Sequence, residues 1–229
     1  MSVILYDLAD GEGRLFSPNC WRTRMALAHK GLAVEARPTR FADIANICGG
    51  TQKTIPVIED GDTVLGDSWA IALYLEDSYR DAPSLFGSDE GRTYAQFVQA
   101  WAQSQLHARL ARLIIKDIHD RLDPADQTYF RKSREKMLGA SLEDVHASRD
   151  DRVADFRAAL QPARLVLGVQ PYLGGEVPRY ADYLLFGALQ WARVISPLVL
   201  LEPEDEVQRW FERCLDLHDG AGRREPACL

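Results

Sequence analysis

The chain has 229 residues, 46% of them hydrophobic, and a formal net charge of −7 at pH 7. This composition is typical of a globular protein with one large or two small domains, and it excludes an intrinsically disordered chain. The negative charge argues against a nucleic-acid partner, and the lack of a run of about 18 apolar residues argues against a membrane span.

The cysteines and the N-terminal segment predict a cytoplasmic protein. Cys20, Cys48, Cys214 and Cys228 have neither zinc nor disulfide-framework spacing, so we expect reduced thiols. The N-terminus lacks a basic segment followed by an apolar stretch, which a secretory signal would need. The five histidines are scattered, so we expect no metal site.

The first 80 residues alternate between predicted strands and helices in the order βαβαββα. An Asp60-Gly61 turn between β-branched runs predicts a hairpin within this part. This order predicts a small mixed sheet with a helical cover. The predicted strands are Ser2–Leu8, Ala33–Pro38, Thr54–Ile58 and Thr63–Leu65, and the predicted helices are Pro18–Lys30, Phe41–Ile47 and one that begins at Asp67 or Ser68.

The rest of the chain is predicted to be entirely helical. A polar segment that contains proline and glycine, Tyr79–Gly91, separates it from the first part and is typical of a domain linker. The predicted helices are Arg92–His119, Pro124–Ser148, Asp151–Leu167, Tyr180–Ile195 and Glu204–Leu217.

Ser17 and Pro18 lie between the first strand and the first helix. Serine is a good N-cap, and proline fits the first helical position because its missing N–H is not needed there. The free N–H groups and the dipole of a helix N-terminus also favour an anion. Ser17 is therefore either only a helix cap or also a donor to a bound anion, and its local sequence favours the first.

A second set of candidates surrounds the predicted hairpin. Pro56 within a strand pattern indicates either an edge strand or a cis peptide that turns the backbone of Ile55 toward a ligand. Asp67 and Ser68 cap the next helix, and they also suit a ligand with an amine and a carboxylate. Lys53 is either a solvated loop residue or the partner of a second carboxylate.

These motifs together resemble the glutathione S-transferase superfamily. Three motifs carry the resemblance: Ser-Pro-x-x-Trp-Arg after the first strand, Thr-Ile-Pro-Val-Ile before the hairpin, and Asp-Ser at the third helix. It implies an N-terminal thioredoxin-like domain over residues 1–80 and an all-helical domain over residues 91–229. It also implies a homodimer paired through helices near residues 70–79 and 92–112.

The resemblance implies glutathione as cosubstrate, with its thiolate as the nucleophile. The implied catalytic residue is Ser17, which would donate to the thiolate, with Asn19 as a second donor. Two alternatives are Tyr6, at the end of the first strand, and a mixed disulfide with Cys20, for which we favour a packing role. The implied glutathione-binding residues are Lys53, Ile55, Pro56, Asp67 and Ser68.

The resemblance also places the electrophile site between the two domains. One wall of this site is predicted on the long helix, where four residues recur at four-residue steps: Phe97, Trp101, Gln105 and Arg109. The alternative is that the aromatic residues belong to the core and the two polar residues to the solvated surface. Phe16, with Leu15, would form the opposite wall.

A narrower likeness exists to bacterial lignin β-etherases and related fungal transferases. It rests on Phe16-Ser17-Pro18 with Trp21-Arg22-Thr23, and on residues 129–135, 138–139 and 142–145 of the second part. We expect the residues of the second part to be structural because they lie on one amphipathic helix. The likeness implies attack on an aromatic electrophile, including cleavage of an aryl ether, although the long C-terminal extension of some etherases is missing. The alternative is a binding protein that holds aromatic metabolites.

One family motif departs from its usual pattern. Residues 178–183 resemble the family's buried helix start, but Arg179 replaces the usual serine or threonine cap. We therefore expect Asp182 alone to close that helix start.

Overall fold

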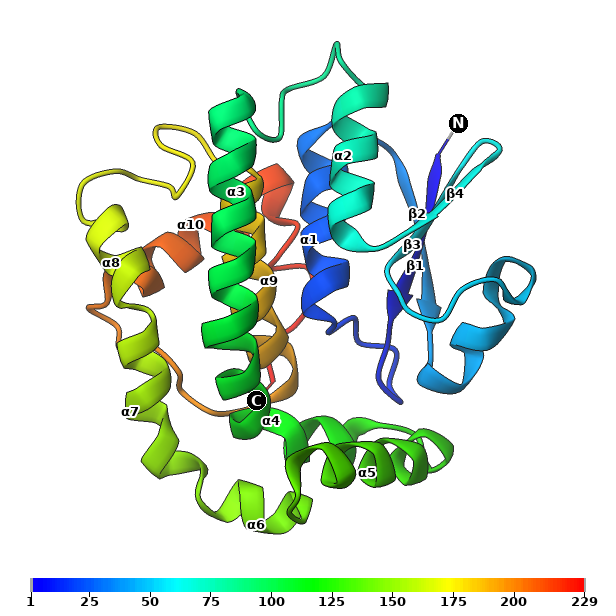
Figure 1. Cartoon of the computed structure of the whole chain (residues 1–229), viewed down its shortest axis with the longest axis vertical. Coiled ribbons are helices and arrows are strands. Elements are labelled where there is room, and N and C mark those ends of the chain that lie inside the picture. Colours follow the sequence, from blue (N-terminus) through cyan, green and yellow to red (C-terminus); the bar gives the residue numbers. More distant parts are fainter. Residues whose placement is uncertain (1, 229) are drawn as a thin grey trace.

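The computed structural model describes residues 2–228. A four-stranded sheet has the order β2-β1-β3-β4, with β1 and β2 parallel and the other pairs antiparallel. Figure 1 shows α1 and α2 between this sheet and the helices of the second part. The predicted order and thioredoxin-like sheet are confirmed. The elements are β1 Val3–Leu8, α1 Pro18–His29, β2 Val34–Thr39, the 3₁₀ segment η1 Phe41–Gly50, β3 Val57–Asp60, β4 Thr63–Gly66 and α2 Ser68–Ser78.

The second part is helical, as predicted. Its long first helix runs without a break from α3 through η2 to α4, and only η2 has π-helical hydrogen bonding. The elements are α3 Asp89–Trp101, η2 Ala102–His107, α4 Ala108–Arg121, α5 Pro124–Leu138, α6 Leu142–Ala147, α7 Arg149–Ala159, α8 Gln161–Leu167, α9 Tyr180–Ile195 and α10 Glu206–Gly220. Among residues 2–228, no helix combines the length and the apolar character needed to cross a membrane.

Two predicted helices are each divided in the structure. The helix predicted over residues 124–148 breaks at Gly139, whose φ of 69° is left-handed, and Ser141 then caps α6 by accepting from the Asp144 N–H. The helix predicted over residues 151–167 breaks at Leu160, because Pro162 at the start of α8 lacks the N–H that a helix interior needs. Strand β3 begins only at Val57, after the proline.

Close packing of α1 against α9 joins the two parts of the chain. Gly187 of α9 lies so near the first turn of α1 that a Cβ atom would be 2.3 Å from the Pro18 carbonyl oxygen. One turn further along, Trp21 packs edge-on against Phe186 with 6.0 Å between ring centroids. The Ser17–Pro18 turn is therefore held directly against the helical part.

Asp182 closes the start of α9, as predicted. Its carboxylate accepts from the backbone N–H of Arg179 at 2.9 Å, of Leu173 at 2.7 Å, and from the Trp210 indole at 2.9 Å. The guanidinium of Arg179 does not cap the helix, because it has no acceptor, and it donates instead to the Ser84 carbonyl oxygen.

Candidate functional site

The site begins at the turn between β1 and α1. Phe16 N–H donates to the Leu8 carbonyl at 3.2 Å, which brings the end of the loop back to the end of β1. The next residue, Ser17, is extended (φ −62°, ψ 128°), and its Oγ accepts from the Cys20 N–H at 3.4 Å. A hydroxyl that accepts one hydrogen bond keeps its own proton for donation. Ser17 is therefore a helix cap that still has a donor to offer.

A cavity of about 630 Å³ opens beside Ser17, between the thioredoxin-like sheet and the helical part. It has the size of a small-molecule site and a mixed aromatic, aliphatic and polar lining. Its lining contains no aspartate or glutamate. The lining residues are Leu8, Phe16, Ser17, Pro18, Asn19, Phe41, Ile44, Ala45, Gln52, Lys53, Thr54, Ile55, Ala111, Ile115, Ile118, Tyr129, Phe130, Arg134, Met137 and Trp191.

The structure brings several sequence-predicted site residues to this one cavity. Phe16 and Ser17 line it from the turn before α1, Asn19 from the first turn of α1, and Lys53 and Ile55 from the segment before β3. The Ile55-Pro56 peptide is cis, as predicted. Pro56 itself is buried beneath this wall and does not line the cavity.

Asp67 and Ser68 lie beside the cavity but do not line it. Gly66 pairs with Val57, and a Cβ on Gly66 would lie 2.9 Å from Gln52 Oε1, so α2 begins next to the cavity-lining segment. Both the Trp69 and Ala70 N–H groups, each at 3.0 Å, bond the same Asp67 oxygen, Oδ1. Within residues 2–228, no hydrogen bond or ion pair reaches Oδ2, which leaves that oxygen for a cation.

Three predicted substrate contacts are not at the cavity. Trp101 is half-buried, while Gln105 and Arg109 are exposed and bond each other, with Arg109 Nη1 donating to the Gln105 carbonyl at 2.7 Å. The same long helix contributes Ala111, Ile115 and Ile118 instead. The π segment η2 holds more residues per turn than an α-helix, so the four-residue line drawn through it does not stay on one face.

Helix α5 supplies a wall that the sequence did not reveal. Tyr129, Phe130, Arg134 and Met137 recur at helical spacing and line the cavity, although we expected this helix to be only structural. The amphipathic pattern was visible, but nothing in it distinguished a cavity wall from a core contact. The other residues missed by sequence reasoning are Leu8, Phe41, Ile44, Ala45, Gln52, Thr54, the α4 residues named above and Trp191.

A buried carboxylate fixes α5 against the thioredoxin-like part. Asp126 is 2% exposed, and its two oxygens accept from the backbone N–H groups of Phe41, at 3.1 Å, and Ala42, at 2.9 Å. These N–H groups belong to the first turn of η1, which has no side-chain cap of its own. The ring of Phe41 also packs against Phe130, with centroids 5.8 Å apart.

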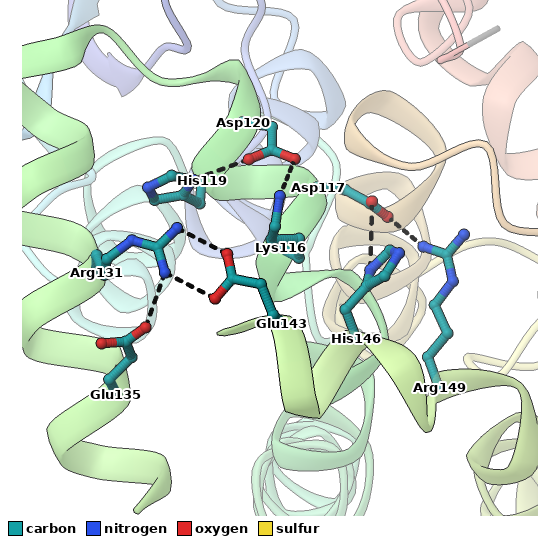
Figure 2. A network of polar contacts seen from close by, with 9 residues as sticks. All are labelled: Lys116, Asp117, His119, Asp120, Arg131, Glu135, Glu143, His146 and Arg149. Carbon is teal, nitrogen blue, oxygen red and sulfur yellow. Dashed lines mark hydrogen bonds and ion pairs between the residues drawn. The ribbon is translucent and has the colours of Figure 1, made fainter. Parts of the chain in front are cut away.

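An ion-pair network supports the other side of α5 (Figure 2). Arg131 donates to both oxygens of Glu143 on α6 and to Glu135, each at 2.9 Å. The Arg131 hydrogen bonds lower the pKa of Glu143 to about 2. Further along, Asp117 of α4 accepts from Arg149 of α7 at 2.9 Å. Helix α5 is therefore held from both sides.

Tyr6 and Cys20, the alternative reactive residues, are poorly placed. The Tyr6 hydroxyl donates to Glu59 at 2.7 Å and does not line the cavity, and burial with this hydrogen bond raises its pKa. Cys20 is fully buried, and burial, reinforced by the nearby Asp7 carboxylate, raises its thiol pKa well above the ordinary value. A thiolate is disfavoured there, which agrees with a packing role for Cys20.

Comparison with known proteins gives consistent matches over both parts. Residues 13–83 match the family model for the glutathione S-transferase N-terminal domain, and residues 93–217 match that for the C-terminal domain. The structure is similar to glutathione transferase GSTFuA3 from Phanerochaete chrysosporium, with 28% identity, a TM-score of 0.76, and coverage of 98% of this chain and 94% of that one.

Two further matches extend this comparison. CsGST63524 of Ceriporiopsis subvermispora, solved in complex with glutathione, has the same fold, with 24% identity, a TM-score of 0.76 and coverage of 98% and 95%. Among sequence relatives, the glutathione S-transferase-like protein ustS of Aspergillus flavus is 27% identical over 220 residues, which span 82% of this chain and 78% of the relative.

Proposed function

The chain belongs to the glutathione S-transferase family, and on that premise we propose that it transfers glutathione to an electrophilic aromatic compound with the help of Ser17. The observation that carries this proposal is the Ser17 hydroxyl at the N-terminus of α1, in the wall of the cavity between the two parts of the chain.

Ser17 would act on the glutathione sulfur as a donor. A free cysteine thiol has a pKa of about 8.5, so little of it is ionised at neutral pH. The Ser17 hydroxyl, together with the N-terminal end of the α1 dipole, stabilises the thiolate relative to the thiol. The thiolate then forms a bond to the electrophilic carbon, and the leaving group departs with its electron pair. Ser17 keeps its own proton throughout.

The thioredoxin-like part offers complementary groups for the rest of glutathione. Lys53 suits a carboxylate of the tripeptide, and Ile55, which lies outside the strand ladder, suits backbone contacts. Oδ2 of Asp67, which no hydrogen bond or ion pair within residues 2–228 reaches, suits the ammonium group, and Ser68 lies beside it at the same helix N-terminus.

The aromatic lining supports an aromatic electrophile. Phe16 packs on Phe41 with centroids 6.5 Å apart, and Phe41 packs on Phe130 at 5.8 Å, so three rings follow one another along the cavity. Aryl ethers are one class of electrophile that this lining fits. The same lining also suits the second candidate function, a protein that binds aromatic metabolites without turnover. Measurable turnover with glutathione and a generic aromatic halide separates the two.

Substitution of Ser17 tests the proposal. We expect Ser17→Ala to lower kcat by about 100-fold, the usual effect of losing one donor to a reacting anion, with little change in glutathione affinity. The pH–rate profile should also shift to higher pH, because the bound thiol then needs more base to ionise. Loss of the cap costs about 1 kcal/mol of stability, so Tm is measured in parallel. A lower Tm with an unchanged pH profile would mean that Ser17 is only a cap.

We also propose a homodimer. Phe97 of α3 is 68% exposed, and α1 lies between α3 and α2 in Figure 1. A large apolar side chain at this position suits an isologous interface. Sedimentation equilibrium at micromolar concentration should give twice the chain mass, and a monomer would contradict the proposal.

A further inference from the structure

The cavity carries positive charge without any negative charge to balance it. Lys53 lines one wall and Arg134 lines the α5 wall, while the lining holds no aspartate or glutamate. Neither cation forms an ion pair with a carboxylate anywhere in residues 2–228. In contrast, Arg131, one turn before Arg134 on α5, pairs with both Glu135 and Glu143. In a chain with a net charge of −7, two unpaired cations at one cavity favour an anionic ligand.

Arg134 is held in place by neutral contacts only. Its guanidinium lies over the Phe130 ring, 4.8 Å from the ring centroid, and its Nη1 donates to the Ser133 hydroxyl at 3.0 Å. A guanidinium has five N–H donors, so most of them remain for a ligand. The stacking contact fixes the guanidinium next to the three-ring series of Phe16, Phe41 and Phe130.

From this arrangement we propose that the electrophile is an aromatic carboxylate, whose ring packs on Phe41 and Phe130 and whose carboxylate binds Arg134. The inference rests on the proposed transferase function and adds the substrate class to it. A planar guanidinium matches a carboxylate with two parallel, charge-assisted hydrogen bonds, which are stronger than those that a neutral aromatic compound can accept. Arg134 is thus a specificity-determining residue.

Glutathione itself carries carboxylates, so it is the other possible source of this anion. The two cations come from different segments: Lys53 belongs to the segment that leads into Ile55, while Arg134 belongs to α5, which also carries Phe130. This division favours Lys53 for glutathione and Arg134 for the electrophile. The experiment must still separate the two sources.

The test compares two electrophiles that differ in a single group, a chloronitrobenzoate with a carboxylate and the matching chloronitrobenzamide with a neutral carboxamide. In Arg134→Gln we expect kcat/KM for the benzoate to fall about 10-fold, the lower range for a hydrogen bond to a charged group, and kcat/KM for the benzamide to change less than about twofold. The KM for glutathione should stay constant. Lys136→Gln is the matched control, because Lys136 is exposed on the same helix and does not line the cavity. Arg134→Lys should recover part of the loss.

Each other outcome overturns the inference. Equal losses for both electrophiles with a raised KM for glutathione would assign Arg134 to the glutathione carboxylate. An unchanged preference for the benzoate in Arg134→Gln would remove its role altogether. If the parent chain turns over neither compound, the transferase proposal fails instead. Calorimetric binding of the benzoate without glutathione then still tests Arg134, because the parent should bind it about 10-fold more tightly than Arg134→Gln, and equal affinities would refute the inference.

Discussion

The two walls of the cavity differ in how they are built. The thioredoxin-like wall presents Ser17 and Asn19 from the start of α1 and Lys53 from the segment before β3. The helical wall combines residues that are distant in sequence, such as Ile115 of α4 and Arg134 of α5. The groups proposed to bind glutathione thus depend on local backbone geometry, whereas the groups proposed to select the second substrate depend on how helices pack. The predictions below test whether the two walls can be disturbed separately.

The largest expected effect concerns the junction that joins the two walls. Nε2 of His29, on α1, lies 3.1 Å from the Ser84 carbonyl oxygen, which can only accept, so Nε2 is the donor. Nδ1 of the neutral ring is then an acceptor, and the Tyr183 hydroxyl donates to it at 2.7 Å. The Tyr183 oxygen in turn accepts from His218 Nε2 at 2.9 Å. This chain of bonds requires a neutral His29, and burial, aided by the neighbouring His218, lowers its pKa from 6.5 to about 4.

The sign of the pH dependence follows from this pKa. Between about pH 4 and pH 6.5, the unfolded chain binds a proton at His29 that the folded chain does not. The free energy of unfolding should therefore fall as the pH is lowered through this window, by on the order of 3 kcal/mol for the full shift. Urea unfolding at several pH values measures this change in the free energy of unfolding. His29→Gln should show a shallower slope, the remainder coming from His107 and His218, whose pKa values are also lowered by burial. Equal slopes would contradict the assignment.

The next effect concerns the helical wall alone. Asp126→Ala removes the acceptor for two N–H groups of η1, which should destabilise the chain by about 2 kcal/mol. Because α5 then loses its attachment to η1, KM for the electrophile should rise more than KM for glutathione. Steady-state kinetics with both substrates varied measures this. Asp151→Ala, an exposed aspartate on α7, serves as the control. Equal increases in both KM values would show that the walls are not separable.

A smaller effect is expected on the thioredoxin-like wall. Asp67→Asn keeps the size and shape of the side chain and retains an oxygen to cap α2. The substitution removes only the charge, so Tm should be unchanged while glutathione binds about 10-fold more weakly. Isothermal titration calorimetry measures the affinity. Unchanged binding in the folded variant would exclude Asp67 as the partner of the glutathione ammonium.

The smallest effect is expected on the outer face of α5. Arg131 and Glu143 pair in solvent, so Arg131→Gln should lower Tm by no more than about 2 °C, and less in high salt. Its kinetic constants should match those of the parent, because Arg131 does not line the cavity. Differential scanning calorimetry at two salt concentrations provides the measurement. A large loss of activity would show that the ion pairs, and not Asp126, hold this wall in place.

Local sequence signals were sufficient for the thioredoxin-like half. The order of strands and helices along the chain and the cap by Ser17 follow from such signals and are found in the structure, and the cis peptide before Pro56 is one of the two predicted alternatives. The closure of α9 by Asp182, in the helical part, is implied by the family resemblance and is also found. These features depend on hydrogen bonds or steric limits among residues a few positions apart, or on a short motif that can be read directly in the sequence. Such features form in nearly the same way wherever the pattern occurs.

Only the tertiary structure decided the helical wall. We expected cavity contacts at Trp101, Gln105 and Arg109, but the structure has them at Ala111, Ile115 and Ile118, beyond a π segment that no local sequence pattern predicts. Gly139 and Pro162 are sequence signals for the breaks at Gly139 and Leu160. The helical periodicity on both sides of each break nevertheless led us to predict single helices. Whether Arg134 faces solvent or the cavity depends on where α5 docks against η1. That position results from packing between distant segments, which periodicity along the chain does not encode.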